Sequence, residues 1–161
     1  MSMIDFNTRL TPTAQAFSSS GAVSTNAFPL TLAGRDFLAG EPMAMVFTVT
    51  TAAAIAGTET YLFKAQTATA SDGTTGSNII ATTPTYTVSA ATIAARNDVL
   101  AAGTQVILAL SPDTIVATAT HLAGFVVVGS SGTISCLIDI MPMRQASQKF
   151  KSYADGRTFA A

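Results

Sequence analysis

Few residues in this chain of 161 could do chemistry. The only histidine, His121, opens an apolar run, and the only cysteine, Cys136, stands between isoleucines. A serine nucleophile of the triad kind needs a histidine base beside it, and the chain has no G-x-S-x-G turn to present one. A thiol on the buried face of a strand stays protonated and inert. We therefore interpret His121 and Cys136 as structural residues.

The nine acidic residues are scattered singly along the chain, whereas metal sites need several ligands close together. Asp72 in SDGTTGSN is similar to the start of a calcium loop, but a lone carboxylate in such a segment is typical of a turn. The glycines there also lack the phosphate-binding pattern G-x-x-x-x-G-K-[ST]. Hydrolysis by two acids from distant strands stays open. We expect no catalytic residue, no metal and no cofactor.

The C-terminal segment has an unusual charge. Residues 1–143 carry four basic and eight acidic side chains, a charge of −4, whereas residues 144–161 carry four basic and one acidic, a charge of +3. The segment is either a solvated terminus or a site that docks on an acidic protein surface, since Arg and aromatic residues are enriched at interfaces. The charge disfavours nucleic-acid binding, because the rest of the chain is acidic. The candidate contact residues are Phe6, Arg9, Arg144, Lys149, Phe150, Lys151, Tyr153, Arg157 and Phe159.

The composition predicts one folded domain. Hydrophobic residues make up 48% of the chain and charged residues only 11%, where about 25% charged is usual. One cysteine cannot form an internal disulfide, which suits a reducing cytosol. The N-terminus has no basic region followed by an apolar run, and no apolar stretch approaches the roughly 20 residues that span a bilayer. We expect neither secretion nor membrane insertion.

Several segments alternate with the period of two that is typical of half-buried strands. They are MAMVFTVTT (43–51), ETYLFKAQT (59–67) and TQVILAL (104–110), with a shorter candidate at 85–89. The residues that share one face are Met45, Phe47 and Val49 in the first, Tyr61, Phe63 and Ala65 in the second, and Val106, Leu108 and Leu110 in the third.

Two further apolar runs, THLAGFVVVG (120–129) and TISCLIDIM (133–141), are separated by Ser130-Ser131-Gly132. This pattern predicts a β-hairpin with a short glycine-containing loop. Asp139 indicates that one face of the second strand is at least partly wet, and Pro142 ends its ladder. The residues expected on the other face of that strand are Ile134, Cys136, Ile138 and Ile140.

We expect a long exposed loop at 67–83, where turn formers cluster. The window 90–102 allows at most one short helix. The fold class is therefore all-β, an antiparallel β-sandwich or jelly roll with extended N- and C-terminal arms. Within a single domain we expect an N-terminal arm with the first strands at 1–34, a sandwich core at 35–143 and a basic arm at 144–161.

Four pieces of the sequence carry a family resemblance. They are STNAFPL (24–30), GEPMAMVFTV (40–49), LAAGTQVILALSPD (100–113), and GTISCLIDI followed by QKFKSYADG (148–156). In order and spacing they resemble the capsid cement, or decoration, proteins of tailed bacteriophages, in particular the jelly-roll type of short-tailed phages. No diagnostic motif is involved.

The resemblance implies a non-enzymatic virion protein that binds the outer surface of an icosahedral head and bridges major capsid subunits. It also implies a symmetric homo-oligomer, with a dimer favoured and a trimer possible, and synthesis in the host cytoplasm. The alternative is a head-fibre or adhesin-like module that binds a host surface glycan, which the absence of Trp disfavours. An unrecognised hydrolase is a third possibility. We expect the presented surface to combine the arms with a sheet edge.

Overall fold

The computed structural model describes residues 9–18, 21–30, 42–52, 57–89, 100–129, 132–143 and 146. The described residues form ten strands and one 3₁₀ turn, η2 (Pro112–Thr114). The strands are β1 (Gln15–Phe17), β2 (Ala22–Val23), β3 (Phe28–Pro29), β4 (Met43–Thr51), β5 (Thr58–Ala68), β6 (Asn78–Thr82), β7 (Tyr86–Ser89), β8 (Gln105–Leu110), β9 (His121–Gly129) and β10 (Ile134–Pro142).

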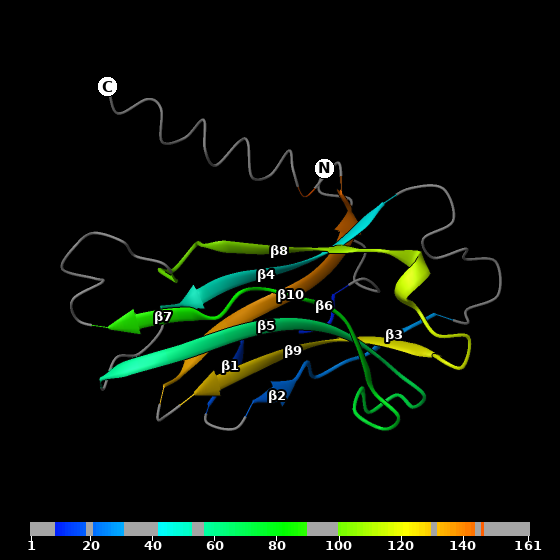
Figure 1. Cartoon of the computed structure of the whole chain (residues 1–161). Coiled ribbons are helices and arrows are strands. Elements are labelled where there is room, and N and C mark those ends of the chain that lie inside the picture. The colour runs from blue at the N-terminus through cyan, green and yellow to red at the C-terminus, as the bar shows by residue number, and fades with distance from the viewer. Residues whose placement is uncertain are drawn as a thin grey trace.

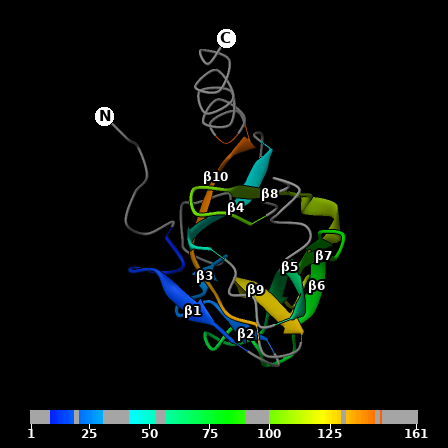
Figure 2. The same ribbon diagram turned by 90° about the vertical axis from the view of Figure 1, so that its left-hand side faces the viewer.

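The strands form two antiparallel sheets that face each other (Figures 1 and 2). One sheet has the order β1-β10-β4-β8, and the other has the order β2-β9-β5-β6, with β3 pairing β9 and β7 pairing β5. Strands early in the chain therefore pair with late ones: β1 with β10, β2 and β3 with β9, and β4 with β8. This nested pairing, closed by β5 with β6 and β7, is the topology of a jelly roll.

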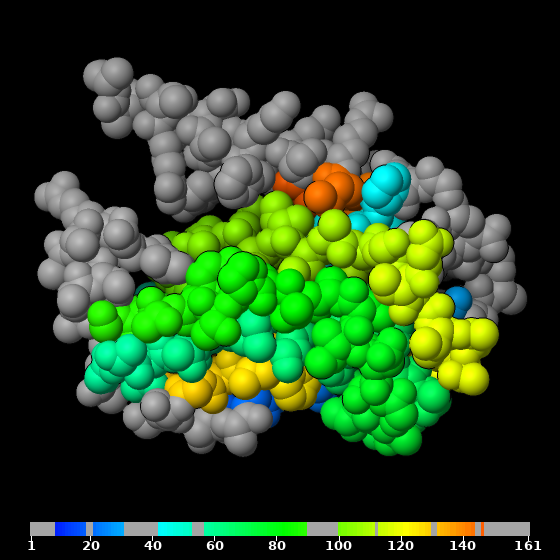
Figure 3. Space-filling model, viewed as in Figure 1, coloured from blue at the N-terminus to red at the C-terminus, as the bar shows by residue number. Residues whose placement is uncertain are grey.

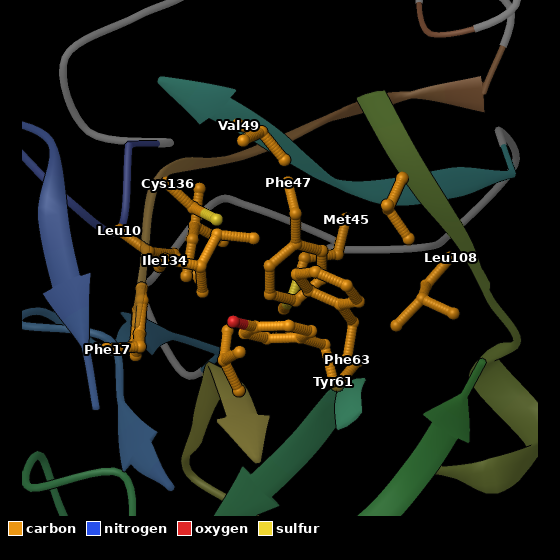
Figure 4. Packing of buried hydrophobic residues seen from close by; sticks show 14 of the residues in the cluster. Leu10, Phe17, Met45, Phe47, Val49, Tyr61, Phe63, Leu108, Ile134 and Cys136 are labelled. Atoms are coloured by element: carbon orange, nitrogen blue, oxygen red, sulfur yellow. The ribbon is translucent and has the colours of Figure 1, made fainter. Parts of the chain in front are cut away.

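The core lies between the sheets and is built from the alternating faces that the sequence predicts. Phe47 of β4 meets Phe63 of β5 edge to face, with ring centroids 5.2 Å apart, and both rings are fully buried (Figure 4). Such pairs add to the free energy gained from burial alone. The predicted inward faces are confirmed: Met45, Phe47, Val49, Tyr61, Phe63, Ala65, Val106, Leu108, Leu110, Ile134, Cys136, Ile138 and Ile140 all belong to one buried cluster.

The predicted hairpin between residues 120–129 and 133–141 is wrong, although both strands are present. β9 pairs with β5 in one sheet, and β10 pairs with β4 in the other. Their apolar faces meet across the core. A Cβ atom at Gly124 of β9 would lie 3.0 Å from the Ile138 side chain of β10. The chain between β9 and β10 therefore joins the two sheets. Two strands connected in this way have the same apolar sequence pattern as the two strands of a β-hairpin.

The N-terminal part of the sandwich is more than an arm. Residues 15–29 supply β1, β2 and β3, the first strands expected within 1–34. Leu10, Phe17 and Phe28, which stand in the segment expected as an arm, are 1%, 0% and 4% exposed and belong to the main core. Isolated apolar residues can complete a core when their backbone pairs with strands that already have an apolar face.

The exposed loop expected at 67–83 is shorter than predicted. Thr67 and Ala68 continue β5, and Asn78–Thr82 form β6, so that the connection covers residues 69–77. The strand expected at 85–89 is present as β7. Of the helix window 90–102, residues 90–99 lie outside the described residues, and residues 100–102 are not helical.

A second, smaller apolar cluster lies on the outer face of the β1-β10-β4-β8 sheet. It consists of Ala44 and Val46 of β4, Met141 of β10, and Ala146, with Ile107 of β8 packed against it. Ala146 is 1% exposed and is the one described residue of the predicted arm 144–161. Within the described part of the chain, there is no helix of the length and apolarity needed to cross a bilayer.

Candidate interaction surface

His121 and Cys136 lie in structural settings. His121 is the first residue of β9, and its Nδ1 lies 2.8 Å from the hydroxyl of Thr120. Cys136 is fully buried in the core, and this burial raises the pKa of its thiol to about 12. Across the described ranges, no group of three or more His, Cys, Asp or Glu residues could hold a metal ion. The Cys136 thiol therefore stays protonated, whereas a cysteine nucleophile reacts as the thiolate.

Asp72 closes the 69–77 loop, in agreement with its interpretation as a turn residue. Its Oδ1 accepts hydrogen bonds from the backbone N–H groups of Thr74 and Thr75, both at 2.9 Å, and its Oδ2 accepts one from the Thr75 hydroxyl at 2.6 Å. The Thr75 hydroxyl and then these backbone groups hold the pKa of the Asp72 carboxyl well below its usual range. The oxygens that a calcium ion would need are engaged in the turn.

Arg9, one of the predicted contact residues, forms an ion pair inside the molecule. Its Nε lies 3.0 Å from Oδ1 of Asp139 on β10, and the two side chains are 32% and 6% exposed. Asp139 itself is therefore buried, because the segment that contains Arg9 crosses over this position and forms a bridge to it. Ser135 and Leu137 on the same face of β10 are half-buried, in agreement with a face that is partly wet. The other predicted contact residues lie outside the described residues: Phe6, Arg144, Lys149, Phe150, Lys151, Tyr153, Arg157 and Phe159.

The structure offers a different surface, on the outer face of the β2-β9-β5-β6 sheet. A shallow depression of about 500 Å³ lies there, and strands β5, β6 and β9 and the 69–77 loop supply its walls. Its lining residues are Lys64, Gln66, Thr74, Ser77, Asn78, Ile79 and Phe125. We call these residues the sheet-face depression.

Lys64 is the charged group of this depression. It pairs in register with Phe125 of β9, and its Nζ lies 5.9 Å from the centroid of the Phe125 ring, within the range of a cation–π contact. The other basic side chain in the described ranges, Arg9, is neutralised by Asp139. Lys64 is therefore the cation that this part of the molecule can offer to a partner.

The rim of the depression is held in place by the 69–77 loop. The buried Gln66 donates from Nε2 to the carbonyl oxygen of Gly73 at 2.6 Å. Gly73 has a φ of 71° and approaches Ala123 and Val23 so closely that a Cβ atom would lie 2.8 Å and 2.9 Å from their side chains. Only glycine meets both requirements at low cost. The loop is thereby fastened to the face of the sheet.

Sequence reasoning missed this surface. Two signals were available: Lys64 stands on the outward phase of β5, and Phe125 stands out of phase with the buried residues Leu122 and Val126 of β9. Neither signal shows that Lys64 and Phe125 are neighbours. Their contact depends on the register of β5 with β9, which the alternation of apolar and polar residues does not determine.

A buried acid at one end of the core was also missed. Glu59 is 2% exposed and shares the inward phase of β5 with Tyr61. Tyr61 donates from its hydroxyl to the carbonyl oxygen of Thr133 at 3.3 Å. Burial, together with the negative charge of Glu59, raises the pKa of Tyr61. A Cβ atom at Gly132 would lie 2.5 Å from the Tyr61 hydroxyl, so Gly132 permits the connection before β10 to pass close over the ring.

Comparison of the sequence with models of known protein families finds no match, and comparison with curated proteins finds none either. The function therefore has to be argued from the residues and geometry of the chain itself.

Proposed function

We propose that the protein is a non-enzymatic structural protein of a bacteriophage virion. It binds the outer surface of an icosahedral head and stabilises it by bridging major capsid subunits. On this proposal it is made in the host cytoplasm and acts on the capsid exterior, with the major capsid protein and further copies of itself as partners. The proposal rests on the resemblance of its sequence pieces to phage cement proteins and on one observation, the incompletely covered apolar side chains on the outer face of the β2-β9-β5-β6 sheet.

That face has the chemistry of a protein-binding surface. Ile79, which lines the depression together with Phe125, is 51% exposed. On the same sheet, Phe125 and the paired residues Leu62 and Val127 are half-buried rather than covered. Adjoining apolar side chains on the surface of a soluble domain are typical of an interaction site. Lys64 adds one positive charge to the depression that Ile79 and Phe125 line, which suits an acidic group on the partner.

The face is also rigid, since strands and a fastened loop carry its residues. A rigid surface loses little conformational entropy when it docks. Many copies arrayed on a shell add weak contacts into strong overall attachment. A rigid sheet face that carries exposed apolar side chains and one cation therefore suits a protein that clamps capsid subunits.

The test is the attachment of purified protein to heads of the encoding phage that lack it. We expect bound wild-type protein, quantified by mass spectrometry, and a higher temperature of head disruption. Ile79→Ser and Lys64→Glu should each weaken binding by about tenfold or more, the effect of losing roughly 1.4 kcal/mol at an interface.

The matched control is Val116→Ser, because Val116 is an exposed β-branched residue, at 43%, that does not line the depression. This variant should bind as the wild type does. Wild-type protein that neither attaches to heads nor changes their disruption temperature would contradict the proposal.

The lining of the depression favours a second candidate, glycan recognition. Gln66, Thr74, Ser77 and Asn78 bring amide and hydroxyl groups around Phe125, and sugars bind through such groups beside an aromatic ring. A glycan array distinguishes the two candidates. Wild-type binding to a defined glycan, lost in Phe125→Ala, together with no attachment to heads, would favour the adhesin-like function.

A further inference from the structure

The free edge of β8 differs from the other sheet edges. β8 (Gln105–Leu110) ends the order β1-β10-β4-β8 and pairs only with β4. Its sequence, QVILAL, contains no charge and no proline. Natural proteins usually protect such an edge with charges, prolines, bulges or shortness, because its unpaired backbone groups invite another strand.

The other edges of the described sheets show these protections. β1 has three residues, and β2 and β3 have two each, with Pro29 in β3. β7 has four residues, and the five residues of β6 pair with β5 through a register shift at Ala65 and Gln66. At six residues, β8 is the longest described edge strand. It is also regular, since its register with β4 runs from Leu110 to Gln105 without a break.

The backbone groups that face away from β4 can be assigned from the ladder. Val49 of β4 donates to the carbonyl oxygen of Thr104 at 2.9 Å. In an antiparallel pair, alternate residues bond to the neighbour and those between them point to the other side. Val106, Leu108 and Leu110 therefore bond to β4. The N–H and C=O groups of Gln105, Ile107 and Ala109 point away from it.

No described residue forms a hydrogen bond with these outward groups. Ala109 is exposed and Gln105 and Ile107 are half-buried. Figure 3 shows β8 at the surface, above the strands β6 and β7. Among the described residues, therefore, nothing pairs with this edge.

We propose that two copies of the chain pair antiparallel through β8 about a two-fold axis at Ile107. The outward groups are self-complementary in this register. Ile107 faces its own counterpart, and Gln105 of each copy faces Ala109 of the other, so that each outward N–H meets an outward C=O. A strand without charge also places no like charges opposite each other. The two four-stranded sheets become one continuous sheet, and the interface is isologous.

The self-complementary register favours a second copy of the chain as the occupant of this edge. Every opposed position is satisfied by β8 itself, and the second copy is always present at the concentration of the first. The pairing specifies the edge and the register through which two copies associate, and it does not depend on capsid binding because it is a property of the isolated protein.

Single cysteines test the register. In Ile107→Cys the two Cα atoms lie about 5.5 Å apart across the axis, within the range of a disulfide. We expect the full-length variant to form a covalent dimer under mild oxidation. Gln105→Cys or Ala109→Cys alone should stay uncoupled, because each lies about 14 Å from its own counterpart. A mixture of these two variants should couple, since Gln105 and Ala109 are opposed. The buried Cys136 is common to all samples.

Ala109→Pro tests the pairing without a cross-link. Proline removes an N–H that points away from β4, so the monomer loses no ladder bond, while the dimer loses bonds on both sides of its axis. We expect wild-type protein to be a dimer by sedimentation equilibrium and Ala109→Pro to be a folded monomer by the same measurement with circular dichroism. Ala109→Thr, which keeps the N–H, should remain dimeric.

A wild-type monomer would overturn the inference, as would a dimer in which Ile107→Cys does not couple. If Ala109→Pro fails to fold, the cysteine series still decides the outcome. Either failure would leave the attachment of the protein to heads untouched, so the two proposals can be judged separately.

Discussion

At the scale of single residues, the core holds polar groups in positions where their chemistry is suppressed. The thiol of Cys136 lies in an apolar cluster, and the carboxyl of Glu59 lies beside Tyr61. Burial disfavours the charged form of a thiol and of a tyrosine hydroxyl. Neither Cys136 nor Tyr61 can therefore act as a nucleophile near neutral pH.

Cys136 yields a prediction about pH. Burial raises the pKa of its thiol to about 12, whereas a thiol in an unfolded chain titrates near 8.5. A raised pKa means that the folded state favours the neutral thiol. Its contribution to stability is thus present below about pH 8.5 and is lost as the pH rises through the window up to about 12.

We expect a thiol reagent at pH 8 to leave Cys136 unlabelled in the native protein and to label it fully in urea. In Cys136→Ala the free energy of unfolding should fall less steeply between pH 9 and pH 11 than in the wild type. Rapid labelling of the native protein would show that the thiol is accessible.

At the scale of elements, short strands contribute more than their length indicates. β1 has only three residues, yet Phe17 at its end is completely buried and belongs to the main core. The strand is fixed to β10 by the register of Gln15 with Cys136 and of Phe17 with Ile134. An edge strand of this size acts by inserting one large side chain.

Two phenylalanines on opposite faces allow a matched comparison. Phe17→Ala should lower the free energy of unfolding by about 3–5 kcal/mol, the usual cost of truncating a buried phenylalanine. Phe125→Ala, on the outer face of the sheet, should cost about 1 kcal/mol or less. Urea unfolding followed by circular dichroism measures both. Equal losses would mean that β1 is not part of the folding unit.

The elements also show how far the sequence could predict the fold. The alternation of apolar and polar residues predicts the strands and their inward faces, as in Met45, Phe47 and Val49, because every second side chain of a half-buried strand faces the core. The alternation does not predict which strands pair with each other. The run before Ser130 and the run after Gly132 have the pattern of a hairpin, but each strand finds its neighbour in a different sheet.

The candidate surface was less predictable than the fold. The depression depends on Lys64 and Phe125 becoming neighbours through the register of β5 with β9, and on a loop that Asp72 and Gln66 fasten over the sheet. No single residue in the sequence indicates the register of β5 with β9 or the contact of the loop with the sheet. Arg9 was a candidate because of its charge, but its partner Asp139 stands 130 positions away in the chain.

At the scale of the whole molecule, the segment before β1 is joined to β10. Leu10 donates from its N–H to the carbonyl oxygen of Ile138 at 2.8 Å, and Ile138 donates from its N–H to the Thr11 hydroxyl at 2.8 Å. The Arg9–Asp139 ion pair lies beside these bonds. Together they fasten the two ends of the described sandwich to each other.

Arg9→Ala should lower the stability of the whole molecule. The change leaves the Asp139 carboxylate, which is 6% exposed, without its opposite charge, and removing one partner of a buried pair costs about 3–5 kcal/mol. Because the Arg9 side chain is 32% exposed, water offsets part of this cost, and we expect about 1–3 kcal/mol in urea unfolding.

The control is the double variant Arg9→Met with Asp139→Leu, which removes both charges and should recover most of the loss. Both proteins should unfold in a single transition. A separate early transition in Arg9→Ala would show that the N-terminal segment unfolds independently of the sandwich.

The nested pairing of the strands has a consequence for synthesis on the ribosome. β1 leaves the ribosome early, but its partner β10 follows roughly 120 residues later, a delay on the order of ten seconds at the ~5–20 residues/s of translation. During that interval Phe17 has no partner strand to bury it. The nascent chain must therefore wait for its last strand before its first can dock, and this interval is when chaperones have most to protect.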